Sequence, residues 1–500
     1  MMKRHALWAA VAATALVACG GGSDSSPSPA PTPAPAPTPG PAPTPIPVVG
    51  DRIEPLDTAL LPRSASLKLL KAPTRQVPAG MPVARVGLGP LPAIAPSPQQ
   101  DKGTALKIGE GRELAATALA ADLAALLNWS PTADGGLVSA VAFSAEGAKG
   151  IRLGVLVHSL PEGATLRFYG ADDAVVEFSS AHVAKLRRNN EAGGVTGNDA
   201  RMVWGPDTAG EVSTLEVQLP PGVAPGALQL AVPRLSHLTM AAAQAWTPQK
   251  SVANIGDSQS CNLDVMCRAD LQAESRSVAK MMYTKRDGIG YMCTGTLLND
   301  AASSRTPYFL TAAHCVSDPY SAGTLITYWF FHSASCNSSP RYASEVMRIE
   351  GGADLLWSDE GIDTTLLRLS SPPPANVVYA GSYFGSGVVP GLEVTGIHHP
   401  AGDLLKYSVG QAQGYAICSG GSCSESDASS GGSLQVSWLS GTTEGGSSGS
   451  ALFAKSGNTR YVIGTLFGGN ASCQNPSGSD YYGRFEKSFA AGINQWLIGQ

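Results

Sequence analysis

The sequence is poor in charge, since only 15% of its 500 residues are Asp, Glu, Lys or Arg and the formal net charge is −5. It contains no run of lysine and arginine, which argues against a nucleic-acid partner bound through its phosphates. A mean hydropathy of +0.01 with 43% hydrophobic residues excludes both a disordered chain and a polytopic membrane protein. At about 100–200 residues per domain, the length allows two or three domains.

Cysteine is absent from residues 50–250, although the whole chain has nine. Eight of them lie after residue 260, and the ninth is Cys19. So many cysteines indicate an oxidising compartment, where eight can pair and one is left over.

A hydrophobic run long enough to span a bilayer of about 30 Å is also missing. The apolar stretch 6–18 is too short and follows Lys3 and Arg4, so residues 1–18 are predicted to be a signal peptide. Its end, LVAC at 16–19, resembles the lipobox of bacterial lipoproteins. This resemblance implies export across the inner membrane and acylation of Cys19, which would anchor an outer-membrane lipoprotein. The alternative to lipidation is ordinary signal cleavage after Ala15. The alternative to an outer-membrane location is an extracellular protein after processing.

Proline occupies every odd position from Pro27 to Pro47, which predicts an extended polyproline spacer within residues 19–49. Short apolar or alternating runs then recur between turn signals through residues 50–250, which predicts a β-sandwich-like domain. The runs are 136–145, 151–160, 164–171, 174–181, 213–220 and 227–235. The segment 113–127 has helical composition without clear periodicity, so its state stays open. This domain is expected to be a pro-region or an accessory binding module.

Three motifs follow in the last 250 residues. The first is TAAHC at 311–315, which ends an apolar strand and lies downstream of CTGTL at 293–297. The second is Asp363 directly before the apolar run TTLLRL; Asp354 and Asp359 compete for its role. The third is the glycine-rich turn GGSSGSA at 445–451. Together they resemble the trypsin/chymotrypsin-like serine proteases.

This resemblance implies an all-β domain of two barrels over residues 251–500, with a triad of His314, Asp363 and Ser448. The oxyanion hole would be formed by the backbone N–H groups of Gly446 and Ser448. Two positions depart from the animal proteases. Ser447 replaces the aspartate that captures a new N-terminus on activation, and Thr442 replaces the acid of the trypsin specificity pocket.

Residues 256–497 are further similar to the bacterial lysyl endopeptidases. The motifs that carry this similarity are SCNLDV at 260–265, IHHP at 397–400, GTLFGG at 464–469 and SDYYGR at 479–484. The similarity implies that Asp480 is the acid of the S1 pocket and binds a substrate lysine; Glu444 is a second candidate. Phe467 departs from the family, which has a histidine there.

The same resemblance implies four disulfides: Cys293–Cys315, Cys261–Cys473, Cys267–Cys336 and Cys418–Cys423. The pair His398-His399 has no partner ligands at zinc spacing, so these histidines are expected to be structural and no metal or cofactor is expected. A stripe of apolar residues at helical spacing predicts a C-terminal helix packed on the second barrel. Its members are Phe485, Phe489, Ile493, Trp496 and Leu497.

These features predict an exported serine endopeptidase that cuts proteins or peptides after Lys, or after Lys and Arg. The alternative is a non-catalytic surface adhesin that keeps a protease fold. The domain boundary is placed between Thr247 and Gly256, where the bond Lys250–Ser251 offers a site that a lysine-specific enzyme could cut in itself.

Overall fold

The computed structural model describes residues 50–61, 72–92, 103–172, 174–240, 258–338, 346–385 and 390–499. The predicted signal peptide, Cys19, the predicted proline-rich spacer and the predicted boundary around Lys250 lie outside these residues. Pro45–Gln500 form one compact unit. Within the described parts of the chain, no helix is long and apolar enough to cross a membrane.

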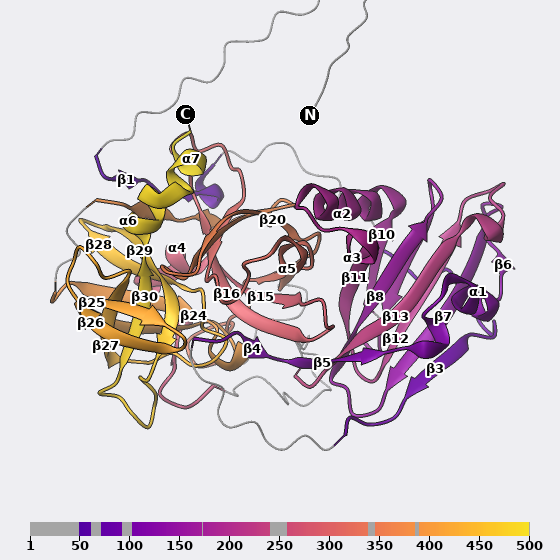
Figure 1. Ribbon diagram of the computed structural model, residues 1–500, viewed down its shortest axis with the longest axis horizontal. Coiled ribbons are helices and arrows are strands. Elements are labelled where there is room, and N and C mark those ends of the chain that lie inside the picture. Colours follow the sequence, from indigo (N-terminus) through magenta and orange to yellow (C-terminus); the bar gives the residue numbers. More distant parts are fainter. Residues whose placement is uncertain are drawn as a thin grey trace, which may run out of the picture. The chain divides into compact units, whose positions relative to one another are not determined.

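The N-terminal region folds into two facing sheets, as the alternating runs predict (Figure 1). The first has the strand order β10-β9-β12-β7-β3, with β6 beside β7. Its strands are β3 (Ala84–Leu88), β6 (Ser130–Pro131), β7 (Leu137–Ala145), β9 (Thr165–Tyr169), β10 (Val175–Ser179) and β12 (Val212–Leu219). The second has the order β11-β8-β13-β5. Its strands are β5 (Gly109–Glu113), β8 (Gly150–Ser159), β11 (Met202–Ala209) and β13 (Gln229–Leu238).

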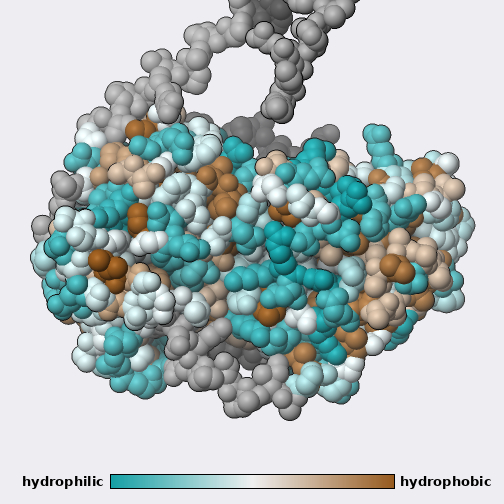
Figure 2. All heavy atoms as spheres, in the orientation of Figure 1, coloured by the Kyte–Doolittle hydropathy of each residue, from teal (hydrophilic) through white to brown (hydrophobic). Residues whose placement is uncertain are grey.

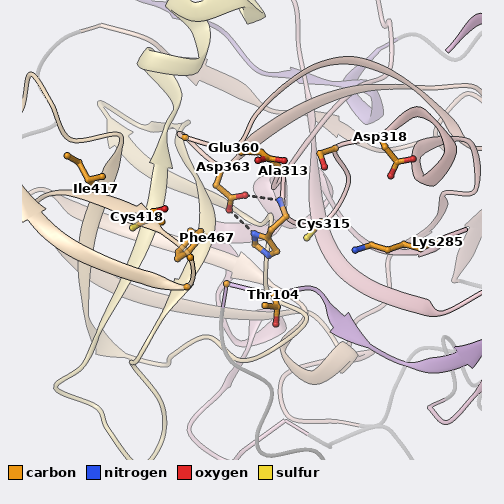
Figure 3. Close-up of a pocket in the computed structure, with 17 residues that line it drawn as sticks. Thr104, Lys285, Ala313, Cys315, Asp318, Glu360, Asp363, Ile417, Cys418 and Phe467 are labelled. Carbon is orange, nitrogen blue, oxygen red and sulfur yellow. Dashed lines mark hydrogen bonds and ion pairs between the residues drawn. The ribbon is translucent and has the colours of Figure 1, made fainter. Parts of the chain in front are cut away.

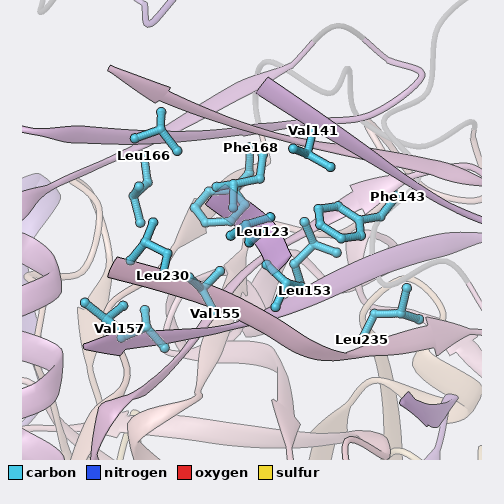
Figure 4. Packing of buried hydrophobic residues seen from close by; sticks show 14 of the residues in the cluster. Leu123, Val141, Phe143, Leu153, Val155, Val157, Leu166, Phe168, Leu230 and Leu235 are labelled. Atoms are coloured by element: carbon cyan, nitrogen blue, oxygen red, sulfur yellow. The ribbon is translucent and has the colours of Figure 1, made fainter. Parts of the chain in front are cut away.

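Apolar side chains from both sheets meet in one core, which Figure 4 shows from close by. Val141 and Phe143 of β7 and Leu153 and Val155 of β8 are fully buried there. The segment whose state was open from sequence forms a 3-10 helix at Ala115–Thr117 and the helix α1 (Ala120–Leu126).

Two helices of this region and its strands β3, β5, β6 and β11 were not expected from the sequence. Strand β10 ends at Ser179, whose hydroxyl accepts from the His182 N–H and so caps α2 (Ser180–Ala192). The helix α3 (Gly197–Arg201) and β11 follow it. The alternating signal in 174–181 thus covers the end of a strand and the first turn of a helix.

The third sheet forms the first barrel of the C-terminal region, in the order β19-β18-β15-β16-β17-β21-β20. Its strands are β15 (Val278–Thr284), β16 (Gly290–Leu298), β17 (Tyr308–Thr311), β18 (Ile326–Trp329), β19 (Met347–Ile349), β20 (Ala353–Asp359) and β21 (Thr364–Leu369). The short helices α4 (Gln272–Ser275) and α5 (Pro319–Gly323) flank it. The N-terminal strand β4 (Leu106–Lys107) adds to the edge of β16.

The fourth sheet forms the second barrel, in the order β1-β23-β29-β28-β24-β25-β27-β30, with β29 also pairing with β30. Its strands are β1 (Arg52–Ile53), β14 (Leu263–Asp264), β23 (Gly381–Tyr383), β24 (Glu393–His398), β25 (Lys406–Ser419), β26 (Ser422–Ser426), β27 (Ser433–Ser440), β28 (Ala451–Ser456), β29 (Thr459–Gly469) and β30 (Ser479–Arg484). The predicted C-terminal stripe lies on α6 (Phe485–Ser488), the π-helix Phe489–Ile493 and α7 (Asn494–Leu497). Phe485, Ile493 and Leu497 are buried in an apolar cluster that contains side chains of both barrels.

The segment from residue 50 to 61 contributes to these later sheets rather than to the sandwich. Strand β1 pairs with β23, and β2 (Leu56–Asp57) pairs with β22 (Val378–Tyr379). An ion pair between Asp57 and Arg276, with one oxygen–nitrogen distance of 2.9 Å, holds this segment in place.

Four disulfides join the cysteine pairs that the family resemblance implies. The visible surface is mostly hydrophilic, with apolar residues scattered over it (Figure 2). Leu60, Leu119 and Leu439 are the most exposed of the large apolar side chains in the described residues.

Candidate active site

His314 lies three residues beyond the end of β17, in a turn that the disulfide Cys293–Cys315 ties to β16. Strand β17 carries only apolar residues and threonine, and it is buried between β16 and β21. The histidine is therefore held at the end of a rigid strand. Its Nε2 atom is buried and has no hydrogen-bond partner among the described residues.

Asp363 precedes β21 and has a φ of +54°, in the left-handed region that residues with a Cβ rarely adopt. Its Oδ2 lies 2.8 Å from Nδ1 of His314, and its Oδ1 accepts from the His314 backbone N–H at 2.8 Å. The competing acids are engaged elsewhere, because Asp354 pairs with Arg368 and Asp359 accepts from the Ile362 N–H. A strained backbone that presents a carboxylate to a histidine is a feature that clusters at active sites.

Ser448 lies in the turn between β27 and β28 and is buried, with 3% of its surface exposed. Gly446 and Gly449 have φ values of +92° and +83°, which glycine adopts without steric cost. A Cβ at Gly449 would lie 2.2 Å from Oγ1 of Thr311 at the end of β17. Only glycine therefore lets the serine turn pack against the strand that leads to His314.

Along this turn, backbone N–H groups that have an acceptor alternate with N–H groups that have none. Those of Ser447 and Gly449 donate to backbone carbonyls of Glu444 and Leu466, whereas those of Gly446 and Ser448 donate to no described residue. The carbonyls of Gly446 and Ser448 are in turn held by Thr294, at 2.9 and 2.8 Å. An oxyanion hole requires two N–H groups beside the nucleophile that have no acceptor within the protein.

Ser447, which departs from the animal proteases, is held by a histidine. Its hydroxyl lies 2.8 Å from Nδ1 of His398, and Nε2 of His398 lies 3.1 Å from the Ser408 hydroxyl. The Ser408 hydroxyl also donates to the Thr442 carbonyl at 2.7 Å. This buried chain of hydrogen bonds holds the serine turn in place. His398 was expected to be structural, but its hydrogen bond to the serine turn was not predicted from the sequence.

The neighbouring His399 is also fully buried, and burial lowers its pKa well below the ordinary value. Its Nδ1 lies 2.9 Å from the Asp403 carbonyl oxygen. Lys280 of β15 is buried close by, donates to the Gly402 carbonyl at 3.1 Å and lies over the Phe331 ring. Burial lowers the pKa of Lys280 to about 7.

Asp480 is fully buried on β30. Its Oδ2 accepts from the indole N–H of Trp438 and from the hydroxyl of Thr443, each at 2.7 Å. A Cβ on Gly469 would lie 2.6 Å from its Oδ1, so the glycine lets the neighbouring strand β29 pass close to the carboxylate. Trp438 and Thr443 were missed by the sequence analysis, because no local motif links them to a residue on another strand.

Glu444, the second candidate for the specificity acid, accepts hydrogen bonds from the Gln259 backbone N–H and the Asn262 side chain. These residues flank Cys261, whose disulfide with Cys473 lies near this loop. The structure therefore places Glu444 in the contact with the N-terminal arm of the barrel domain.

An open cleft of about 840 Å³ lies beside His314 and Asp363 (Figure 3). Phe467 of β29 forms one wall, and its ring meets the His314 ring edge to face with 6.0 Å between centroids. Gly103 and Thr104 from the N-terminal region also line the cleft. Nothing in the sequence around these two residues signals that position.

Among the described residues, one group has the composition of a possible metal site: Cys293, His314 and Cys315. The two cysteines are joined in a disulfide, so neither can supply the thiolate that a metal ion requires. This group is therefore explained by the disulfide beside the histidine.

Two family models and a curated relative match this chain. A family model described as "Lysyl endopeptidase, C-terminal domain" matches residues 255–483, and "Lysyl endopeptidase N-terminal domain" matches residues 87–239. A lysyl endopeptidase of Pseudomonas aeruginosa is 32% identical over 406 residues, covering 78% of this chain and 80% of the relative.

Solved structures similar to part of the chain include an active-form protease from M. tuberculosis, with 16% identity and a TM-score of 0.30. It matches 51% of this chain and 94% of its own. A thermostable serine protease, AL20, from an extremophilic microorganism has 14% identity and a TM-score of 0.31. The match covers 46% of this chain and 100% of the AL20 chain.

Proposed function

The chain belongs to the lysyl endopeptidase family and is a serine endopeptidase, and we propose that His314, Asp363 and Ser448 carry out hydrolysis after lysine. The observation that carries this proposal is the pairing of a histidine and a strained aspartate beside a glycine turn with two undonated N–H groups.

In the proposed reaction, the Ser448 hydroxyl attacks the scissile carbonyl while Nε2 of His314 takes its proton. Asp363 accepts the Nδ1–H of the ring, so the neutral histidine presents an unprotonated Nε2 to the serine. The same carboxylate stabilises the imidazolium that forms. Nε2 then gives the proton to the leaving amine, and a water molecule repeats the sequence to release the acid.

The negative charge that develops on the carbonyl oxygen would be stabilised by the N–H groups of Gly446 and Ser448. These donors are fixed before the reaction because Thr294 holds both residues through their carbonyls. Fixed donors need no reorganisation in the transition state, which is why such sites contribute several kcal/mol to catalysis.

Lysine selection is proposed to reside in Asp480. Its carboxylate is fully buried, with Oδ2 accepting from Trp438 and Thr443, and a buried carboxylate would form a close ion pair with a substrate ammonium. A lysine side chain is long enough to bring an ammonium to the base of such a pocket, and arginine would have to fit its larger planar group there.

Export is proposed from the predicted signal peptide and the four disulfides, since disulfides persist in oxidising compartments. Cys19 would carry the lipid anchor. Labelled palmitate should be incorporated by the natural chain and not by Cys19→Ser. Equal labelling of the two, or none in the natural chain, would refute the anchor.

A fluorophosphonate probe tests the nucleophile. The probe should label the protein at Ser448, and Ser448→Ala should abolish the label. A label that persists in this variant, or a natural chain that never reacts in its processed form, would refute the assignment and favour a non-catalytic binding protein.

Paired variants test the specificity acid. Asp480→Asn should lower kcat/KM for lysyl peptides by about 100-fold or more, because it removes one partner of a buried ion pair, and should change neutral peptides little. Glu444→Gln should leave the preference for lysine unchanged. A loss of preference in Glu444→Gln and not in Asp480→Asn would transfer the role to Glu444.

A further inference from the structure

The loop that follows β24, His399–Asp403, packs against the serine turn, and we term it the support loop. The N–H of Ala401 donates to the Gly445 carbonyl at 2.6 Å. A Cβ on Gly446 would lie 3.0 Å from the Gly402 nitrogen. The support loop is therefore in close backbone contact with the two glycines that open the serine turn, and the N–H of Gly446 is one of the proposed oxyanion donors.

The support loop has a strained backbone. Ala401 has a φ of +52°, in the left-handed region that a residue with a Cβ rarely adopts. The Gly402 N–H donates to the His399 carbonyl at 3.2 Å, on one side of the loop. The Asp403 N–H donates to the Pro400 carbonyl at 2.8 Å, on the other. Strained residues persist only where their surroundings hold them, and they gather at functional sites.

Lys280 of β15 reaches this loop from the first barrel. The residue is 1% exposed, and its Nζ donates to the Gly402 carbonyl at 3.1 Å. Nζ also lies 3.6 Å from the centroid of the Phe331 ring, and the Phe331 carbonyl accepts from the Leu405 N–H at 2.9 Å, just beyond the support loop. A Cβ on Gly402 would lie 2.3 Å from Sδ of Met292 on β16. The support loop is thus packed between the first barrel and the serine turn.

An apolar side chain would fill the position of Lys280 without burying an amine. The next two residues of β15, Met281 and Met282, are apolar and fully buried. Burial disfavours the charged form of an amine and lowers the pKa of Lys280 to about 7. Among the described residues, the Gly402 carbonyl is the one hydrogen-bond acceptor of Nζ. A buried amine contributes little to stability by itself, so its single bond to a strained loop indicates that it holds the loop.

We propose that Lys280 is a positioning residue for the oxyanion hole, which holds Gly402 and so keeps the N–H of Gly446 aimed at the substrate carbonyl. This inference rests on the proposed function of the serine turn. Thr294 of β16 donates to the Gly446 carbonyl at 2.9 Å, and the support loop contacts the same glycine from the second barrel. The oxyanion donor is therefore held on two sides, and Lys280 secures one of them.

Loss of the lysine would reach the serine turn in two steps. The Gly402 carbonyl would lose its donor, and Ala401 would then relax out of its left-handed conformation. Because Ala401 donates to Gly445, the relaxation would displace the turn. An oxyanion donor acts on charge that develops in the transition state, so its displacement lowers kcat and leaves KM nearly unchanged.

Lys280→Met tests the proposal, because methionine fills much of the same space without a donor. The assay measures kcat and KM for a chromogenic lysyl peptide on the processed enzyme, per mole of folded protein. We expect kcat to fall about 10- to 100-fold and KM to change less than about twofold, because a small displacement of a positioned group costs that much. Lys455→Met is the matched control, since Lys455 is an exposed residue of β28, and it should leave both constants unchanged.

Ala401→Gly in the Lys280→Met background tests the route through the loop. Glycine adopts a positive φ without steric cost, so the support loop should keep its conformation without the lysine. The double variant should recover kcat by about threefold or more relative to Lys280→Met. A lysine that served only the packing of the barrel would show no such rescue.

Phe331→Leu offers a second route should Lys280→Met not accumulate as folded protein. It removes the ring against Nζ and should lower kcat about threefold with KM unchanged. A kcat of Lys280→Met within about twofold of the control, or a loss carried by KM, would overturn the proposal. A double variant no faster than Lys280→Met, or an unchanged kcat in Phe331→Leu, would do the same. Full activity in Ser448→Ala would instead refute the proposed function itself.

Discussion

Replacing Asp363 by asparagine should reverse the tautomer of His314. An asparagine has one acceptor and one donor end, and the structure dictates which end goes where. Oδ1 of Asp363 accepts the backbone N–H of His314 at 2.8 Å, so the oxygen of the amide has to occupy that place. The NH2 group then lies 2.8 Å from Nδ1, which must become an acceptor. The ring proton moves to Nε2, which can no longer take the proton of Ser448.

The flipped amide would avoid this tautomer only by pointing its NH2 at the backbone N–H. Two donors would then face each other in a site where Asp363 is 6% exposed, and an unsatisfied buried group costs about 1–3 kcal/mol. The oriented amide is therefore favoured. The equivalent change in a trypsin-type triad lowers kcat by about 10⁴-fold, which is about 5.5 kcal/mol of transition-state stabilisation. We expect a loss of that order here.

The assay is kcat for a chromogenic lysyl peptide, normalised to the concentration of folded protein, together with the ¹⁵N shifts of the His314 ring. Asp359→Asn is the matched control, because Asp359 accepts from the Ile362 N–H in its own turn and has no bond to His314 among the described residues. A loss of less than about tenfold, or a neutral ring that still carries its proton on Nδ1, would refute the reasoning from geometry.

Two further predictions concern buried polar groups. Thr443→Val removes one of the donors to Asp480 and should lower kcat/KM for lysyl peptides about tenfold. The control Thr442→Val should leave kcat/KM unchanged, because the Thr442 hydroxyl has no partner among the described residues. Equal effects of the two variants would contradict the role of Thr443. Lys280→Met, in an inactive Ser448→Ala background, should raise Tm more at pH 6 than at pH 9. The pKa of Lys280 is lowered from 10.5 to about 7, so the folded state binds fewer protons between these values and burial of the lysine destabilises most below pH 7. A gain in Tm that does not change with pH would refute this assignment.

The parts of the site that local sequence predicted are those that local chemistry determines. His314 follows the apolar strand β17, and Asp363 directly precedes the apolar strand β21. The glycines around Ser448 permit a turn with positive φ. Each of these features is set within a few residues along the chain, because strand propensity, burial pattern and glycine conformation are short-range properties. The runs of the sandwich domain are predictable for the same reason.

Other features depend on segments that meet only when the barrels close. The bond from Trp438 to Asp480 joins residues 42 positions apart, and that from His398 to Ser447 joins residues 49 apart. Neither pair has a sequence signal, because register between distant strands is decided by packing and not by local pattern. The helix α2 was missed for a different reason, since the strand-like run before it continues into the capped first turn.

The sequence by itself determined the chemical groups of this protein: a serine, a histidine and an aspartate in strand-and-turn contexts, eight cysteines in the last half, and a cysteine-free β-rich region before them. The tertiary structure alone decided what covers those groups. Only the folded chain, in which β4 pairs with β16, brings Leu106 to the serine turn, across more than 300 residues of chain. Composition and spacing cannot encode such a contact, because it arises from the shape of two folded surfaces.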